Sequence, residues 1–214
     1  AQRGRVGGPP ATPRAGAPVD LTGFWVSIVT EDWRARMTTL PKGERPGVPL
    51  NGEGGRVTNE WDPAKDEAAG EQCRAYGAAG VMRAPGRLHI TWADDTTLKV
   101  ETEAGTQTRL FKFGGPSPQA GAASWQGDSA AQWEVSGGGR RGRGAAPQGG
   151  DLKVMTTHMR PGYSQKNGVP YGANAVLTEY FNRTNESDGT SYLIVVSIID
   201  DPQYYTTAFI RSTH

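Results

Sequence analysis

The feature that most constrains the fold is a run of alternating apolar and polar residues over positions 87–113. In RLHITWA (87–93), the large apolar residues all fall on one face of an extended chain and the polar residues between them on the other. A period of two residues is typical of a half-buried β-strand. The alternation continues in 97–103 and 106–113, after an Asp-Asp turn and an Ala-Gly turn. The run therefore predicts a meander of three antiparallel strands.

Strand-like segments also occur on both sides of this meander. They are 23–29, 151–159, 175–183, 190–199 and 206–213, with shorter ones around Trp125 and Trp133. A helix is predicted at 62–76, because Asp62 suits the N-cap, Pro63 the first turn and Gly77 the end. Short connections favour antiparallel neighbours. We predict a mainly β fold of about 8–10 strands with one short helix, either a single antiparallel, calycin-like barrel, which leaves no exposed edge, or a sandwich.

The chain divides into an extended arm, residues 1–18, and one domain, residues 19–214. Glycine and proline make up 45 of the 214 residues, and they are concentrated in the arm and in low-complexity loops at 114–123 and 136–150. The arm shows no hydrophobic periodicity, so it cannot form a core of its own. The rest of the chain is long enough for one domain.

Positive charge gathers in the arm and in the second loop. Residues 1–18 carry +3 and residues 137–150 carry +3, so the other 182 residues carry −5 of the total of +1. A basic arm on an acidic body favours contact between copies of the chain. The candidate assembly contacts are Arg3, Arg5, Val6, Arg14, Arg140, Arg141 and Arg143. Nucleic-acid binding needs a broader basic face, so we expect none.

No apolar run approaches the roughly 20 residues that cross a bilayer, and no membrane span is expected. The chain begins with Ala1 rather than Met, from which we expect a processed bacterial protein that is exported to the periplasm or the extracellular space. Its single cysteine, Cys73, cannot form an internal disulfide, and we expect it to be buried as a small hydrophobe.

DLTGFW (20–25) resembles the Gly-x-Trp opening of the lipocalin and calycin barrels. In those barrels the Trp packs at the closed end, and an Arg from the last strand commonly lies over it. The resemblance implies a barrel-closing pair of Trp25 and Arg211, with a cation–π contact of about 0.5–2 kcal/mol. It covers the first and last strands, and the chain departs from the family in lacking disulfides and in its Gly/Arg loop.

The middle of the chain carries a second resemblance. GRLHITW (86–92) and ETEAGTQTRLFKF (101–113) resemble exported bacterial proteins that have no assigned activity. This resemblance implies a location and no chemistry.

The sequence contains no motif of catalysis. Its three histidines show no metal-binding spacing, no Cys-x-x-Cys occurs, and there is no nucleophile elbow or phosphate loop. We therefore expect no cofactor and no metal site, and we assign no catalytic residue.

One polar set is predicted inside the fold. Glu179 and Arg109 each share a strand face with large apolar residues, and a buried charge requires a partner. The two side chains can pair with each other. The pair is either a structural ion pair or a polar anchor in a ligand cavity, with His158 as a neighbour.

These observations favour an extracellular structural protein, a subunit that self-assembles into a filament or another oligomer. Its arm would contact neighbouring copies, and head-to-tail contacts propagate when the rotation does not close. The prolines of the arm favour extended docking over strand insertion. Two alternatives stay open: a lipocalin-like binding protein for a small apolar ligand, and an enzyme that uses Glu179 or His158. The lack of a catalytic motif favours the non-enzymatic alternatives.

Overall fold

The computed structural model describes residues 12–115, 121–135 and 149–214, and the structural statements below concern these residues. Nine strands form one sheet in the order β1-β2-β3-β4-β5-β6-β9-β10-β11, and β7 and β8 form a second, small sheet. The strands are β1 (Gly23–Val26), β2 (Arg87–Trp92), β3 (Thr97–Thr102), β4 (Gln107–Phe113), β5 (Asp128–Val135), β6 (Gly150–Thr157), β7 (Gly162–Gln165), β8 (Val169–Tyr171), β9 (Val176–Asn185), β10 (Ser191–Asp200) and β11 (Phe209–Thr213).

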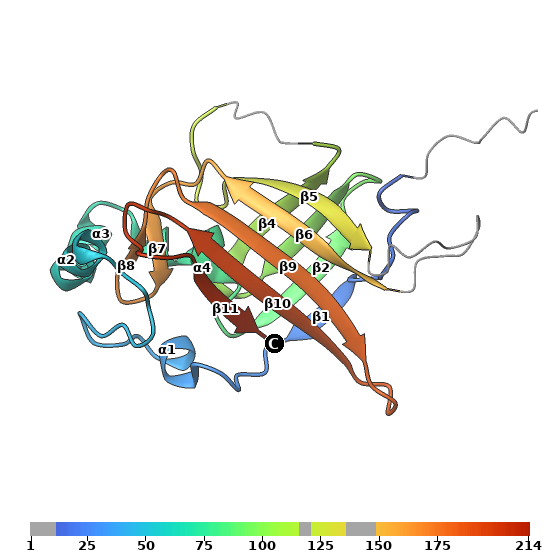
Figure 1. Cartoon of the computed structure of the whole chain (residues 1–214), viewed down its shortest axis with the longest axis horizontal. Coiled ribbons are helices and arrows are strands. Elements are labelled where there is room, and N and C mark those ends of the chain that lie inside the picture. The colour runs from blue at the N-terminus through green and yellow to red at the C-terminus, as the bar shows by residue number, and fades with distance from the viewer. Residues whose placement is uncertain (1–11, 116–120, 136–148) are drawn as a thin grey trace, which may run out of the picture.

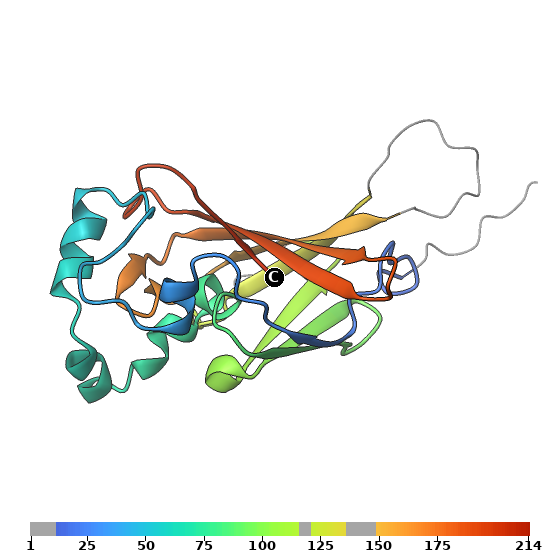
Figure 2. The same cartoon turned by 90° about the horizontal axis from the view of Figure 1, so that it is seen from below.

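The large sheet curls into a half-barrel (Figures 1 and 2). Its neighbouring strands are antiparallel except β4 and β5, which run parallel over three residue pairs from Phe111↔Ser129 to Phe113↔Ala131. The sheet thus consists of two antiparallel halves, β1–β4 and β5-β6-β9-β10-β11, joined at one parallel pair. The predicted mainly β class and the three-strand meander over 87–113 are confirmed.

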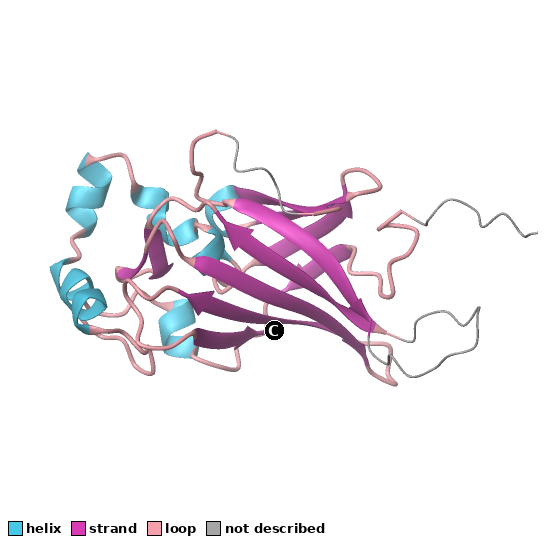
Figure 3. Ribbon diagram, turned by 45° about the horizontal axis from the view of Figure 1, so that its top comes forward, coloured by secondary structure: helices cyan, strands magenta, loops and turns pink. Residues whose placement is uncertain are grey.

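The helices gather at one end of the half-barrel and beside its open side (Figure 3). They are α1 (Trp33–Met37), α2 (Gly52–Glu60), α3 (Pro63–Ala68) and α4 (Ala78–Val81), with the 3-10 turns η1 (Gln72–Tyr76) and η2 (Ala104–Thr106). The sequence predicted one helix, so α1, α2 and α4 were missed. Helix α2 begins at Gly52, where the side chain of Asn51 caps it by accepting a hydrogen bond from the amide of Gly54 at 2.9 Å.

The helix predicted at 62–76 is shorter than expected. Asp62 does cap it, accepting a hydrogen bond from the amide of Ala64 at 3.1 Å, and Pro63 occupies the first turn. The helix ends at Ala68 because Gly70 adopts a left-handed φ of 69°, which an α-helix cannot continue. The chain then resumes as η1, on which Cys73 is exposed rather than buried.

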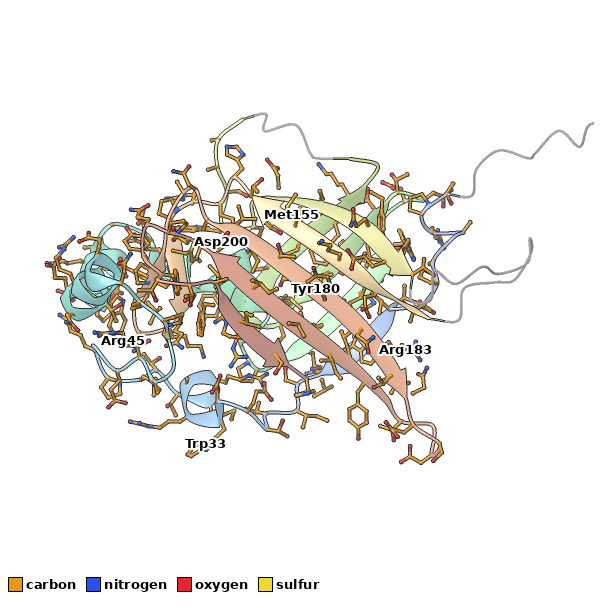
Figure 4. The ribbon with its side chains drawn as sticks, in the orientation of Figure 1. Trp33, Arg45, Met155, Tyr180, Arg183 and Asp200 are labelled. Carbon is orange, nitrogen blue, oxygen red and sulfur yellow. The ribbon has the colours of Figure 1, made fainter. Side chains whose placement is uncertain are left out.

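The concave side of the half-barrel holds the main core. The alternation of β2, β3 and β4 turns Ile90, Val100 and Phe111 inward, where each is fully buried, against Leu152 and Phe181 from the other half. Burial of such side chains contributes roughly 1.5–3 kcal/mol each. Met155 and Tyr180 lie on the convex, outer face (Figure 4). A second core of buried side chains, which includes Met159, Leu177 and Phe209, lies toward the helical end.

The half-barrel stays open between its two edge strands. Strand β11 covers only residues 195–199 of β10, so residues 191–194 of β10 have no strand beside them on that side. Strand β1 has four residues and pairs with β2. One backbone hydrogen bond, from the amide of Ile28 to the carbonyl of His214 at 3.1 Å, links the two edges within the described chain. The full closure expected of a barrel therefore does not occur, and we call this gap the seam.

Tyr205 gives the second core a dependence on pH. Its hydroxyl lies 2.9 Å from the Ser164 hydroxyl and donates to the carbonyl of Pro170 at 3.0 Å, and burial raises its pKa to about 12. An unfolded tyrosine ionises near pH 10. A folded pKa above the unfolded one stabilises the fold fully below pH 10, and this contribution is lost as the pH rises toward 12.

We therefore expect the free energy of unfolding to fall by about 2 kcal/mol from this group between pH 10 and 12. Urea unfolding of the wild type and of Tyr205→Phe at a series of alkaline pH values measures it. The variant should be less stable at neutral pH, because it lacks the hydroxyl, and should lose less stability as the pH rises. An equal loss of unfolding free energy per pH unit in the two proteins would contradict the assignment of this loss to Tyr205.

Candidate functional site

Arg109 on β4 and Glu179 on β9 form a bidentate ion pair across the inside of the half-barrel. Nη1 donates to Oε1 at 3.0 Å and Nη2 to Oε2 at 2.6 Å, and neither side chain has any exposed surface. Nη2 of Arg109 also donates to the hydroxyl of Thr156 at 3.2 Å, which lies 2.8 Å from that of Ser129. The pair and the two hydroxyls thus form one hydrogen-bonded group from four strands, β4, β5, β6 and β9, and the two opposite charges neutralise each other as burial requires.

His158, the third member of the predicted interior set, lies elsewhere. Its Nδ1 is 3.0 Å from Oδ2 of Asp128, at the point where β5 begins, and both side chains are partly exposed. The structure thus brings Arg109 and Glu179 together and leaves His158 apart from them. Phe111 and Phe181 pack beside the pair, with the Arg109 guanidinium 4.9 Å from the centre of the Phe111 ring. The ion pair lies in packed core.

The expected barrel-closing pair of Trp25 and Arg211 is not formed. Arg211 is an inward residue of β11 and donates to the carbonyls of Ser164 at 2.9 Å and Ala79 at 2.6 Å, on the helical side. Trp25 lies across the seam on β1, and the guanidinium over its ring, at 5.6 Å from the centre, belongs to Arg183 of β9 (Figure 4). The reason is that Arg211 faces the helical side, where backbone carbonyls accept its hydrogen bonds, so that Arg183 is the guanidinium beside Trp25.

A pocket of about 380 Å³ occupies the seam. Its walls are β1 with the residues that follow it, the uncovered part of β10, and the end of α4 with the start of β2. The lining residues are Thr22, Phe24, Trp25, Val26, Ser27, Ile28, Met82, Ala84, Leu88, Arg183, Gly189, Ser191, Tyr192, Leu193, Val195, Thr213 and His214. Apolar and polar atoms contribute about equally to this surface.

The polar groups of the seam pocket include two basic side chains and no carboxylate. Arg183 donates to the carbonyl of Asp20 at 2.7 Å and to the hydroxyl of Ser191 at 3.2 Å. Hydrogen bonds from Thr22, opposed by partial burial and aided by the charge of Arg183, lower the pKa of the Asp20 carboxyl. His214 is the second basic residue, and its Nδ1 lies 3.1 Å from Oε2 of Glu31.

The lining of this pocket combines apolar side chains and polar groups in about equal measure. Concave surfaces that combine apolar side chains with a few placed polar groups are common small-molecule sites. Arg183, held between Trp25 and Ser191, can meet an anionic or hydrogen-bonding group, and the apolar walls can hold a hydrocarbon body.

The first described residues of the arm lie along the molecule's own body. The indole of Trp133 donates to the carbonyl of Pro13 at 2.9 Å, and the amide of Arg14 donates to the carbonyl of Asp95 at 3.2 Å. Arg14 also makes an exposed ion pair with Asp95 at 3.7 Å. The other candidate assembly contacts, Arg3, Arg5, Val6, Arg140, Arg141 and Arg143, lie outside the described residues.

Within residues 12–115, 121–135 and 149–214, no three metal-ligating side chains cluster as a metal site needs. The helices of this part of the chain are also too short or too polar to cross a bilayer. Comparisons with known protein families, with curated proteins and with solved structures found no match. The candidate site is therefore defined by its own geometry.

Sequence analysis did not find the seam pocket. The Gly-x-Trp opening pointed to the right strand, since Trp25 lines the pocket. Nothing in the sequence indicated that residues 191–193 of β10 would line a pocket together with β1.

The ion pair gives a prediction for stability. Glu179→Ala leaves the Arg109 charge buried without a partner, so we expect the free energy of unfolding to fall by about 3–5 kcal/mol. Urea unfolding measures the loss, and an m-value equal to that of the wild type shows that the change is one of stability. The double variant Arg109→Met/Glu179→Leu, which removes both charges, should recover most of it.

A matched control is the exposed pair of Arg56 and Glu53, 2.6 Å apart on α2. Glu53→Ala should leave the unfolding midpoint nearly unchanged, because water screens exposed pairs. If Glu179→Ala lowers the free energy of unfolding no more than Glu53→Ala does, the interior pair does not stabilise the fold.

Proposed function

We propose that this protein binds a small amphipathic molecule in the seam pocket. The apolar part lies against Trp25, Leu88 and Leu193, and an anionic group meets Arg183. The observation that carries the proposal is the pocket itself, whose lining places apolar side chains beside the guanidinium of Arg183.

The size of the pocket supports this function. Small-molecule sites commonly measure about 300–1,000 Å³, and the seam pocket has about 380 Å³. The site differs from that of a lipocalin-like barrel, where the ligand lies inside, because the interior here is filled by the main core and the ion pair of Arg109 and Glu179. The ligand instead takes the place of the strand that would have closed the sheet.

Burial of the ligand's hydrocarbon supplies the affinity, at roughly 25 cal/mol per Å² of apolar surface removed from water. Arg183 supplies selectivity for a carboxylate or a similar acid, because a charge-assisted hydrogen bond is about twice as strong as a neutral one. We propose a periplasmic or extracellular setting, which rests on the resemblance of the middle of the chain to exported bacterial proteins.

A second proposal is self-assembly, favoured by the placement of charge. The basic arm and the basic loop attach at the end of the large sheet opposite to α2 and α3 (Figure 1). Pro13 bonds to Trp133 there, and Pro18 packs on Gly150, next to the loop. Residues 51–76, which hold α2, α3 and η1, carry six carboxylates and three basic side chains, a net charge of −3. One end of a copy therefore complements the other end of the next.

The ligand proposal is tested by calorimetry and by tryptophan quenching with medium-chain fatty acids and the matched alcohols. We expect the acids to bind. Arg183→Gln should weaken the binding of the acids about tenfold and leave the binding of the alcohols unchanged. The reason is that the lost interaction is a charge-assisted hydrogen bond partly open to water. Ser191→Trp should block both classes by filling the pocket.

The matched control is Arg87→Gln on β2, an exposed arginine that pairs with Glu103 and does not line the pocket. It should bind both classes like the wild type. Trp25→Phe identifies the quenched tryptophan among the six in the chain. Equal binding by wild type and Ser191→Trp, or no binding across the panel, would remove the proposal.

The assembly proposal is tested by sedimentation and electron microscopy of the full chain at low and high salt. We expect oligomers or filaments at low salt that dissociate as salt rises, because the contact is electrostatic. Deletion of residues 1–11, combined with Arg140→Ser, Arg141→Ser and Arg143→Ser, should leave monomers. Glu67→Lys on α3 should weaken assembly, and Glu101→Lys on β3 should not. Monomers of the wild type at every salt concentration would exclude assembly.

A further inference from the structure

Three arginine side chains are buried on the helical side of the seam: Arg36 on α1, Arg83 after α4 and Arg211 on β11. Their exposed fractions are 3%, 8% and 6%. They lie close together, since Nε of Arg36 donates to the carbonyl of Arg83 at 3.1 Å. Burial, followed by the charge of Arg83, lowers the pKa of the Arg211 guanidinium to about 10.

The carboxylates around this group do not balance it. Glu31 binds Nη1 of Arg36, and Asp32 accepts from Nη2 of Arg83 at 2.7 Å. Arg211 donates to backbone carbonyls and has no carboxylate partner within the described chain. Glu179 is already engaged by Arg109. One positive charge is therefore in excess where burial makes an unpaired charge costly.

A small cavity of about 30 Å³ lies beside these side chains. Its polar lining comes from Arg36, Arg83, Ser164, Gln165 and Lys166, and no carboxylate side chain is among its described lining residues. Nη2 of Arg36 is buried and has no hydrogen-bond partner in the described part of the chain, and the same is true of Oε1 of Gln165. A buried guanidinium nitrogen without an acceptor, beside a space without a carboxylate, indicates a missing anion.

We propose that this cavity binds one monoatomic anion, of the size and charge of chloride. Arg36 donates to it through Nη2, and Arg83 and Lys166 supply positive charge around it. The volume suits a single body about as large as a water molecule and excludes phosphate and sulfate, which have five heavy atoms. Rotation of the Gln165 amide by a half turn presents its NH2 group as a second donor.

The anion would stabilise the position of the segment that runs from β1 to α1. Nη1 of Arg36 reaches the carbonyl of Ile28 at 3.5 Å, and Ile28 lines the seam pocket. Arg83 binds the other edge of the seam, through the hydroxyl of Thr213 at 3.3 Å. A bound anion therefore stabilises the folded state on both sides of the seam.

The test compares thermal unfolding in sodium chloride and in sodium gluconate at constant ionic strength. We expect Tm to rise with the chloride fraction by about 4 °C per tenfold increase once the site is occupied, because an anion that binds only the folded state stabilises it by mass action. Arg36→Lys keeps the charge but removes the Nη2 donor, and its Tm should not depend on chloride. Arg34→Lys, on the exposed side of α1 and paired with Glu44, is the control and should respond like the wild type.

Crystals of the wild type grown in bromide give a measurement that does not depend on a variant folding. We expect an anomalous peak within hydrogen-bond reach of Nη2 of Arg36. Equal Tm values in chloride and gluconate for the wild type, an undiminished chloride response in Arg36→Lys, or water in the cavity of the bromide crystals would each overturn the proposal.

Discussion

The ion pair between Arg109 and Glu179 joins the two halves of the large sheet from the inside. The halves are β1–β4 and β5-β6-β9-β10-β11, and the strand pairing that joins them is the short parallel pairing of β4 with β5. Arg109 stands on the first half, and its partners Glu179 and Thr156 stand on the second. A bidentate guanidinium–carboxylate pair fixes distance and orientation together. The curl of the sheet, and with it the position of the seam, depends on this contact.

The seam lies between the two edge strands of the large sheet, β1 and β11. Within the described residues, β11 pairs with residues 195–199 of β10, and residues 191–193 of β10 line the pocket. Open strand edges are a hazard for a protein in water, and here the side chains at the seam limit it. Arg183 covers Trp25, and Phe24 on the outer face stacks on His89 with ring centres 4.0 Å apart. The buried arginines lie on the helical side of the same gap, so the pocket and the arginine group border one structural element.

Local patterns in the sequence predicted the parts of the fold that depend on neighbours in the chain. The meander of β2, β3 and β4 followed from alternation, and the start of α3 from Asp62 and Pro63. The inward position of Arg109 and Glu179 followed from the strand faces that they share with apolar residues. Features that depend on distant contacts could not be found this way. The parallel pairing of β4 with β5, the pocket between β1 and β10 and the choice of Arg183 over Arg211 above Trp25 each result from how separate segments meet.

The division of the sheet into two halves also shapes how the chain folds. Short connections join β2 to β3, β3 to β4 and β9 to β10, so these pairs can form early from local contacts, whereas β4 and β5 meet across residues 114–127. Docking of the halves then comes late, and until it happens each half exposes an unpaired strand edge and half of a buried ion pair. A second molecule at the same stage offers the same complementary half. Exchange of halves between two chains is thus the characteristic misfolding route of this architecture, and it becomes more frequent as the concentration of folding chains rises.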